Sequence, residues 1–305
     1  MDLKALLTTF ANNLLPILLV SGAGFLLGKT LNVDSRSLGR VVFYVFSPIL
    51  VFNLLVHTKV NSGEIAATVG YTVMVGAVVG CIAYALGSLL HFERPVLMAI
   101  IITAAFGNTG NYGLPLVSFA FGQEALAFAT LNFVTSVVLF NTAGVLLASL
   151  GHMDLRTAAL GVFRVPAVYA VVVAAALNRS QIVLPTPLER TIDLAANGSI
   201  PVMLILLGVE LARVQWSHSI RAVGLSAGLR LLAGPAIGFA LAALFGFRGP
   251  VRQGNIIESG MPAAVTNMVL ASEYGLDTSL VTAMVFLGTI LSPLTLTPLL
   301  VYLGK

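Results

Sequence analysis

Hydrophobic residues run along this chain in long stretches that short polar connections separate. A helix needs about 20 consecutive apolar residues to cross the hydrocarbon core of a bilayer. Ten stretches are long enough, and they are residues 6–28, 38–56, 64–90, 95–121, 123–149, 157–177, 189–209, 220–245, 250–274 and 278–302. The pattern therefore predicts an all-α polytopic membrane protein with ten transmembrane helices.

Two of the ten stretches are interrupted by residues that suit a helix poorly. The fourth contains Gly107-Asn108-Thr109-Gly110-Asn111-Tyr112-Gly113-Leu114-Pro115, and the ninth contains Glu258-Ser259-Gly260-Met261-Pro262. Glycine and proline disfavour helix interiors, and unwound backbone inside a membrane must be buried in protein or line a wet cavity. We expect helix breaks at Gly110, Gly113, Pro115, Gly260 and Pro262, with new half-helices beginning near residues 111–115 and near Pro262. A pair of interrupted helices indicates the binding site of a secondary transporter.

Proline positions indicate an internal repeat. Three pairs have similar offsets: Pro16 and Pro166 lie 150 residues apart, Pro48 and Pro201 lie 153 apart, and Pro115 and Pro262 lie 147 apart. We predict one five-helix repeat over residues 1–150 and a second over residues 151–305. Because five is an odd number, the halves enter the membrane in opposite directions, as inverted repeats whose broken fourth and ninth helices cross.

Composition and charge narrow the class further. The chain has 305 residues, of which 58% are hydrophobic and 9% are charged, against roughly 25% charged in soluble domains. Its basic residues are scattered, which argues against nucleic-acid binding. The single cysteine, Cys81, excludes a disulfide framework and a thiolate metal site. No HExxH motif is present, so an intramembrane enzyme lacks its catalytic residues, and we predict neither enzyme activity nor a resident cofactor.

The distribution of Lys and Arg predicts the orientation. If ten helices cross the membrane, seven of the 16 basic residues lie on the side of the N-terminus and nine on the other side. Positive residues favour the cytoplasmic side, so this small excess predicts that both termini are outside the cell membrane.

The first candidate site is one for an organic anion. Half-helix N-termini carry partial positive charge and free N–H groups, which favour a carboxylate. Asn108, Asn111, Thr266 and Asn267 would add neutral hydrogen bonds, and no Lys or Arg lies in either break. Asparagine also caps helices, and that structural role is the alternative. Arg230 is expected to extend to the membrane interface.

Glu258 is the second candidate site, because a carboxylate near mid-membrane is costly. Insertion scales give a cost on the order of 2.5–3.5 kcal/mol for Asp at the helix centre. Glu258 also precedes a break, at the negative end of a half-helix. A bound cation or a proton would compensate, and Asn108, Thr109 and either Thr135 or Ser136 could supply further oxygens. The alternative is a neutral, hydrogen-bonded Glu258.

Several of these motifs resemble the auxin efflux carrier family, which includes the plant PIN proteins and bacterial carriers. The matching stretches are Leu15-Pro16-Ile17, Val42-Phe43-Tyr44-Val45-Phe46-Ser47-Pro48, Asn108-Thr109 with Gly113-Leu114-Pro115, Ser199-Ile200-Pro201, Leu229-Arg230-Leu231-Leu232-Ala233-Gly234-Pro235, and Met261-Pro262-Ala263-Ala264-Val265-Thr266-Asn267 followed by Ala271-Ser272-Glu273-Tyr274-Gly275. The resemblance implies a scaffold of helices 1, 2, 6 and 7 beside a transport unit of helices 3–5 and 8–10. It also implies elevator-type movement of organic anions, a homodimer formed through the scaffold, and contact of Asn108 and Asn267 with the substrate carboxylate.

One stretch departs from the plant carriers. Glu258-Ser259-Gly260-Met261 is similar to the Glu-x-Gly-Met stretch of bile acid:sodium symporters, a related fold in which the glutamate binds Na⁺. That resemblance implies a Na⁺ site at Glu258, with Asn108, Thr109, Met261, Thr135 and Ser136 as candidate ligands.

These expectations combine into one prediction. The protein is a multi-pass carrier of small organic carboxylates, either auxin-like acids or short mono- and dicarboxylates, and Na⁺ is its coupling ion. A proton-coupled carrier or a uniporter is the alternative within the transport class. A membrane receptor or sensor for an anion is the alternative from another class, although the short loops leave it nothing with which to pass on a signal.

Overall fold

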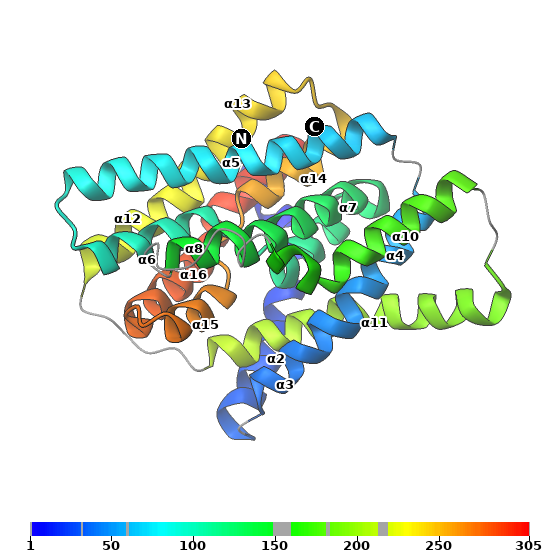
Figure 1. The fold of residues 1–305 in the computed structure, drawn as a ribbon, viewed down its shortest axis with the longest axis horizontal. Coiled ribbons are helices and arrows are strands. Elements are labelled where there is room, and N and C mark those ends of the chain that lie inside the picture. Colours follow the sequence, from blue (N-terminus) through cyan, green and yellow to red (C-terminus); the bar gives the residue numbers. More distant parts are fainter. Residues whose placement is uncertain are drawn as a thin grey trace.

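The computed structural model describes residues 2–31, 33–58, 61–148, 160–180, 184–212 and 219–304. Within these ranges all regular elements are helices, which confirms the predicted all-α class (Figure 1). Residues 149–159 contain the predicted boundary between the repeats and the start of the sixth stretch, so both lie outside the described part of the chain.

The helices of the first half follow the predicted stretches. They are α1 (Leu3–Thr9), η1 (Phe10–Leu14), α2 (Leu15–Thr30), α3 (Ser35–Val41), η2 (Val42–Phe46), α4 (Ser47–His57), α5 (Ser62–Leu89), α6 (Arg94–Ala105), η3 (Thr109–Gly113), α7 (Leu114–Leu139), η4 (Phe140–Gly144) and α8 (Val145–Ala148). The elements η1, η2 and η4 are single π-helical turns that join the α-helices on either side into longer helices, whereas the π turn η3 begins the helix that continues as α7.

The second half begins, in its described part, with a short 3₁₀ segment. Its elements are η5 (Leu160–Arg164), α10 (Pro166–Ser180), α11 (Thr186–Leu211), α12 (Ile220–Gly228), the π turn η6 (Leu229–Ala233), α13 (Gly234–Leu244), α14 (Gly249–Ser259), α15 (Thr266–Glu273) and α16 (Thr278–Leu303).

Within the described part of the chain, seven helices are long and apolar enough to cross a membrane, and α6 is a shorter apolar helix. The longest, Thr109–Ala148, has a non-helical kink at Gly122, where φ is 75° and ψ is −165°. It therefore holds the second part of the fourth predicted stretch and the fifth stretch. The ninth stretch forms two short helices, α14 and α15. The protein is thus a multi-pass membrane protein, and its ten crossings remain a prediction.

Four prolines in the long helices follow π turns. Pro16, Pro48, Pro115 and Pro235 each lie two positions after the last residue of a π turn, whereas Pro201, Pro293 and Pro298 lie inside α11 and α16 without one. Proline has no N–H and its ring displaces the carbonyl one turn earlier, and a π turn opens the backbone enough to accept both effects. These prolines therefore bend helices without interrupting them.

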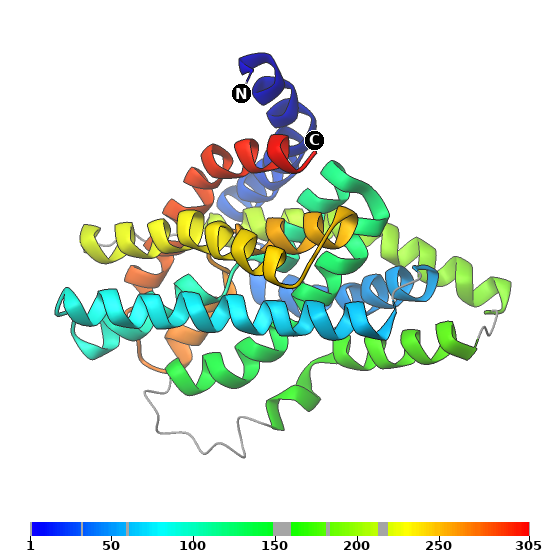
Figure 2. The ribbon, with the colours of Figure 1, turned by 90° about the horizontal axis from the view of Figure 1, so that it is seen from above.

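The helices pack in two groups. In one group α2 lies against α11 and α4 against α10, and in the other α7 lies against α14, α5 against α6, and α12 against α16. Figure 2 shows α5 (cyan) beside the α12–α13 helix (yellow), and the two termini lie close together in both views. Glycine allows α2 and α11 to approach closely, because a β-carbon on Gly24 or Gly208 would overlap the backbone of the other helix.

The outer surface is apolar, as a lipid-facing surface requires. Large side chains such as Leu26, Tyr84, Leu194, Leu232 and Leu294 are exposed on different helices. Several polar side chains are buried near the two helix breaks, and they form the candidate functional site.

Candidate functional site: the crossing of two broken helices

The two broken helices meet through their unwound segments. Gly107 and Ala263 form an isolated antiparallel bridge. The Asn108 N–H donates to the Pro262 carbonyl at 2.7 Å, and the Ala264 N–H donates to the Phe106 carbonyl at 3.0 Å. The backbone groups that the breaks free from their helices thus satisfy one another inside the protein, as they must at membrane depth.

The breaks themselves differ from the predicted positions. The first comprises Phe106–Asn108 and lies before Gly110, Gly113 and Pro115, which belong to the π turn η3 and the start of α7. The π turn accepts Pro115, so no break is needed there. The prediction was wrong for these three residues.

The second break is longer than predicted. It runs over residues 260–265 and includes Gly260 and Pro262 as expected. The next half-helix, α15, begins at Thr266 and not near Pro262. The extra extended residues are those that pair with the first break.

Arg230 lies in the crossing, which contradicts the expectation that it reaches the membrane interface. It comes from the π turn η6 and is 3% exposed. Its Nε donates to the Met261 carbonyl at 2.6 Å, its Nη1 to the Ala104 carbonyl at 3.3 Å, and its Nη2 to the Glu258 carbonyl at 3.2 Å. Carbonyls at helix C-termini lack donors within the helix, and one guanidinium supplies donors to the ends of both α6 and α14.

Glu258 is buried beside the same crossing. Its side chain is 1% exposed, and neither carboxylate oxygen has a hydrogen-bond partner among the described residues. The carboxylate packs against Gly113, where a β-carbon would overlap it. Arg230 donates to the backbone carbonyl of Glu258 and not to its side chain. A buried carboxylate without donors is costly, so Glu258 can accept a cation or a proton.

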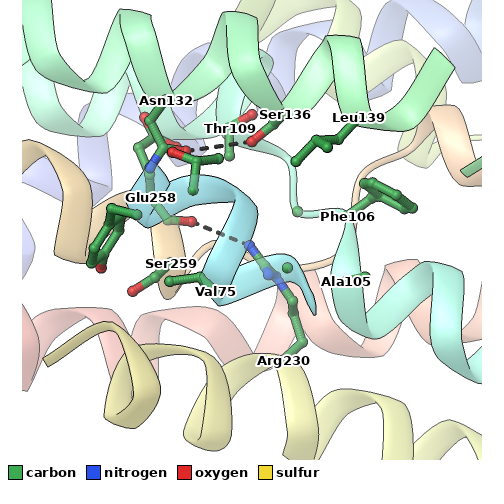
Figure 3. A pocket seen from close by; sticks show the side chains of 14 residues that line it. Val75, Ala105, Phe106, Thr109, Asn132, Ser136, Leu139, Arg230, Glu258 and Ser259 are labelled. Carbon is green, nitrogen blue, oxygen red and sulfur yellow. Dashed lines mark hydrogen bonds between the residues drawn. The ribbon is translucent and has the colours of Figure 1, made fainter. Parts of the chain in front are cut away.

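Arg230 and Glu258 line a small shared cavity of about 30 Å³. Figure 3 shows both residues with Thr109, Asn132 and Ser136 around it. Such a volume suits a water molecule or a small cation. It is far below the roughly 300–1,000 Å³ of pockets that bind drug-sized ligands. The crossing in this conformation therefore has no room for an organic anion.

The lining of the cavity changes the set of possible cation ligands. Thr109 and Ser136, two of the predicted candidate ligands, line it, and so does Asn132, which sequence reasoning missed. Thr135 is outside the lining, and its hydroxyl donates to the Leu131 carbonyl at 2.8 Å. The residues at positions 132 and 136 lie four apart on one helix and so share a face, a spacing that could have identified Asn132.

The backbone carbonyl of Met261 accepts the 2.6 Å hydrogen bond from Arg230, and Met261 is not among the residues that line the cavity. Asn132 is itself fixed by neighbours. Its Nδ2 donates to Asn255 Oδ1 at 3.0 Å, and its Oδ1 accepts a 3.4 Å bond from the Ser136 hydroxyl.

The predicted anion-binding residues separate into different environments. Asn108 Nδ2 is buried without a partner in the described structure, and Asn108 makes no side-chain cap. Asn267 donates through Nδ2 to the Phe106 carbonyl at 3.1 Å, so its orphan atom is the acceptor Oδ1. Asn111 is half-buried, and Thr266 is exposed. The crossing thus brings together Asn108 and Asn267, and Thr266 lies on an outer face of α15.

A second, larger cavity of about 890 Å³ lies between the two helix groups. Leu50 and Leu54 of α4 and Asn197 of α11 line one side, and Phe128 of α7 lines the other. This cavity has the size that an organic ligand needs.

Comparison with known proteins agrees with this architecture. The sequence profile described as "Membrane transport protein" matches residues 9–300. An uncharacterized transporter of Methanothermobacter thermautotrophicus is 29% identical over 289 residues, covering 92% of this chain and 94% of the relative. A putative malonate transporter of Rhizobium meliloti is 27% identical over 297 residues, covering 91% and 90%. A probable auxin efflux carrier component 5b of Oryza sativa subsp. japonica is 30% identical over 144 residues, covering 45% and 39%. The chain therefore belongs to the membrane transport protein family.

Proposed function

We propose that the protein is a secondary transporter of small organic carboxylates across the cell membrane. The observation that carries the proposal is the crossing itself, where the Glu258 carboxylate and the side-chain nitrogen of Asn108 are both buried and have no partner among the described residues. Broken helices that cross near mid-membrane supply substrate and ion sites in secondary transporters. The similarity to a putative malonate transporter and to auxin efflux carriers suggests the substrate class.

The anion would bind beside Asn108 at the start of the η3–α7 half-helix. Both unpaired hydrogens of the Asn108 amide and the positive helix end favour a carboxylate. The 30 Å³ cavity is too small for it, so binding requires the crossing to open toward the 890 Å³ cavity. An elevator-type movement of one helix group against the other would give that access.

The transporter would consist of two inverted five-helix repeats. The packing of α2 and α4 against α11 and α10 supports a scaffold of helices 1, 2, 6 and 7. The second half of each broken helix ends at a glycine with positive φ, which is Gly122 (75°) in the first repeat and Gly275 (69°) in the second. These glycines lie 275 − 122 = 153 residues apart, and Pro48 and Pro201 are separated by the same number of residues. Repeats of this kind support crossed helices and alternating access.

Na⁺ would be co-transported at Glu258. Thr109, Asn132 and Ser136 share the small cavity with the carboxylate and can supply neutral oxygens. Glu258 suits this role because both its oxygens lack donors. A proton on Glu258, or no coupling ion, is the alternative; Arg230 and Tyr71 are the other titratable side chains of that cavity.

Uptake into proteoliposomes tests the function directly. Labelled malonate and a labelled auxin would be offered with an inward Na⁺ gradient, with an equal K⁺ gradient, and with an inward proton gradient in K⁺. We expect Na⁺-driven accumulation that Glu258→Gln abolishes. Accumulation driven by the proton gradient alone would move the coupling ion to H⁺. Absence of uptake of any organic acid under all three gradients would contradict the proposed function.

Orientation and assembly are further parts of the proposal. Both termini would face the outside, and two copies would associate through the scaffold helices. Because Cys81 is the only cysteine, a Cys81→Ala background with a cysteine placed beside either terminus permits labelling by an impermeant maleimide on whole cells. If both termini are protected from the reagent, they face the inside of the cell, and the proposed orientation is wrong.

A further inference from the structure

We propose that Arg230 and Glu258 form a charge switch that couples cation binding to anion binding. In this switch Arg230 is a permanent positive charge at the crossing, and the Glu258 carboxylate masks it until a cation neutralises the carboxylate. The inference rests on the proposed carboxylate transport for its physiological meaning. The charge interaction itself involves only the two buried side chains.

Arg230 is fixed in place and in charge. An arginine side chain does not lose its proton in proteins. Three backbone carbonyls hold the guanidinium, and Gly107 supports it from one side, where any β-carbon would overlap it. The guanidinium therefore stays at the crossing as a resident cation.

Glu258 is the acid that balances it. Among the residues that line the small cavity, Glu258 is the one carboxylate and Arg230 the one cation. With Glu258 ionised the cavity is neutral, and an arriving carboxylate meets a negative group. With a cation on Glu258 the cavity carries one net positive charge. Buried charges interact strongly in surroundings of low dielectric constant, so this change alters anion affinity.

The guanidinium packs on Gly107, and the next residue along the chain is Asn108, whose side-chain amide nitrogen has no partner in the described structure. The uncovered charge is thus one residue along the chain from the proposed anion contact. The order of events follows: cation first, then anion. This order prevents the carrier from binding the anion without its cation.

Arg230 also limits the number of coupling ions. Carbonyls at C-terminal half-helix ends are where carriers of this architecture coordinate cations. Here the carbonyls of Ala104, Glu258 and Met261 accept hydrogen bonds from Arg230. The Glu258 carboxylate is the one anionic group among the residues that line the cavity, which gives one coupling cation for each carboxylate.

Cation titration of purified protein tests the switch without any organic substrate. The midpoint of thermal unfolding would be followed as NaCl replaces KCl at constant ionic strength, for the wild type, Arg230→Gln, Arg230→Lys and Glu258→Gln. Arg221→Gln is the matched control, because Arg221 is exposed on the same helical segment. Removal of the positive charge is expected to lower the Na⁺ concentration needed for half-maximal stabilisation by at least about tenfold. Arg230→Lys and the control should respond like the wild type, and Glu258→Gln should not respond.

An unchanged Na⁺ response in Arg230→Gln would overturn the switch, whether or not malonate is transported. Conversely, a switch without carboxylate uptake would overturn only the proposed function. If Arg230→Gln cannot be recovered as folded protein, the double variant Arg230→Gln/Glu258→Gln decides. Loss of one partner leaves a buried uncompensated charge, and loss of both does not. Recovery of the double variant alone supports the charge pair, and loss of both variants would show that Arg230 only holds the carbonyls.

Discussion

The two breaks at the crossing are built from different chemistry. The first, Phe106–Asn108, is short and neutral and contains Gly107, and the second, residues 260–265, is longer and follows the buried Glu258. The charges belong to the second half of the chain, and the glycines that make room for them belong to the first. Gly107 lies against the Arg230 guanidinium and Gly113 against the Glu258 carboxylate.

This difference shows that the two halves are complementary and not equivalent. One half supplies a surface without side chains and the free amide of Asn108, and the other supplies a cation and an anion. Each break satisfies groups of the other, because the Pro262 carbonyl accepts from the Asn108 N–H, and the Phe106 carbonyl accepts from the Ala264 N–H and the Asn267 side chain. The functional site exists only where the halves cross.

The largest effect is expected from filling the glycine surface. Gly107→Ala would push a β-carbon into the guanidinium, and overpacking of a tight core typically costs about 1–3 kcal/mol. Gly228→Ala is the control, because nothing lies within 4 Å of a β-carbon there. We expect a lower midpoint of thermal unfolding and loss of uptake for Gly107→Ala only. Equal behaviour of the two variants would mean that Gly107 is not needed for close approach.

The two asparagines of the crossing should respond differently to alanine. Asn267→Ala removes the hydrogen bond to the Phe106 carbonyl and should cost about 0.5–1.5 kcal/mol of stability. Asn108→Ala removes a side-chain nitrogen that has no partner among the described residues, so stability should be kept while carboxylate uptake is lost. Thermal unfolding and uptake measured on both variants check this. If Asn108→Ala transports normally, the amide does not contact the substrate.

The cation ligands on α7 can be separated by neighbouring substitutions. Ser136→Ala removes a hydroxyl that lines the cavity, whereas Thr135→Val removes one that already donates to Leu131. We expect a higher Na⁺ requirement for thermal stabilisation in Ser136→Ala and no change in Thr135→Val. The reverse result would restore Thr135 as the ligand and exclude the face that holds Asn132.

The smallest effect concerns the turns that follow the broken helices. The second turn is capped by Asp277, which accepts the Leu280 N–H at 3.1 Å, whereas the first turns at Gly122. The Ser279 hydroxyl and backbone N–H groups lower the pKa of Asp277 below 3.8. Because the pKa of Asp277 is lowered in the folded state, its carboxylate contributes fully to the free energy of unfolding at neutral pH. This contribution is lost as the pH falls below 3.8 and through the folded pKa.

Asp277→Ala tests the cap. Because Asp277 is exposed, we expect a cost of about 0.5–1 kcal/mol at pH 7, at the low end for N-caps, and a smaller cost at pH 3. Unfolding midpoints of wild type and variant at the two pH values give the comparison. A cost that does not depend on pH would show that the charge of the cap contributes nothing.

Much of the architecture is accessible from the sequence, because membranes impose simple rules on a chain. Stretches near 20 apolar residues gave the long helices, and the interruptions in the fourth and ninth stretches placed the breaks to within a few residues. Glu258 was identified as a candidate site residue because a carboxylate inside an apolar stretch is energetically costly. The position of Gly110, Gly113 and Pro115 was misjudged because π turns, which depend on local backbone geometry, absorb prolines without ending a helix.

The sequence alone determined the class of the protein, its membrane helices, the two breaks and the buried acid, since hydropathy and helix propensity act locally along the chain. Only the tertiary structure decided what those groups meet. It brought Arg230 into the crossing from 28 residues before Glu258, replaced Thr135 by Asn132 in the cavity, and turned Thr266 outward. These outcomes depend on how separate helices pack, because a buried guanidinium is stable only where several distant carbonyls converge on it.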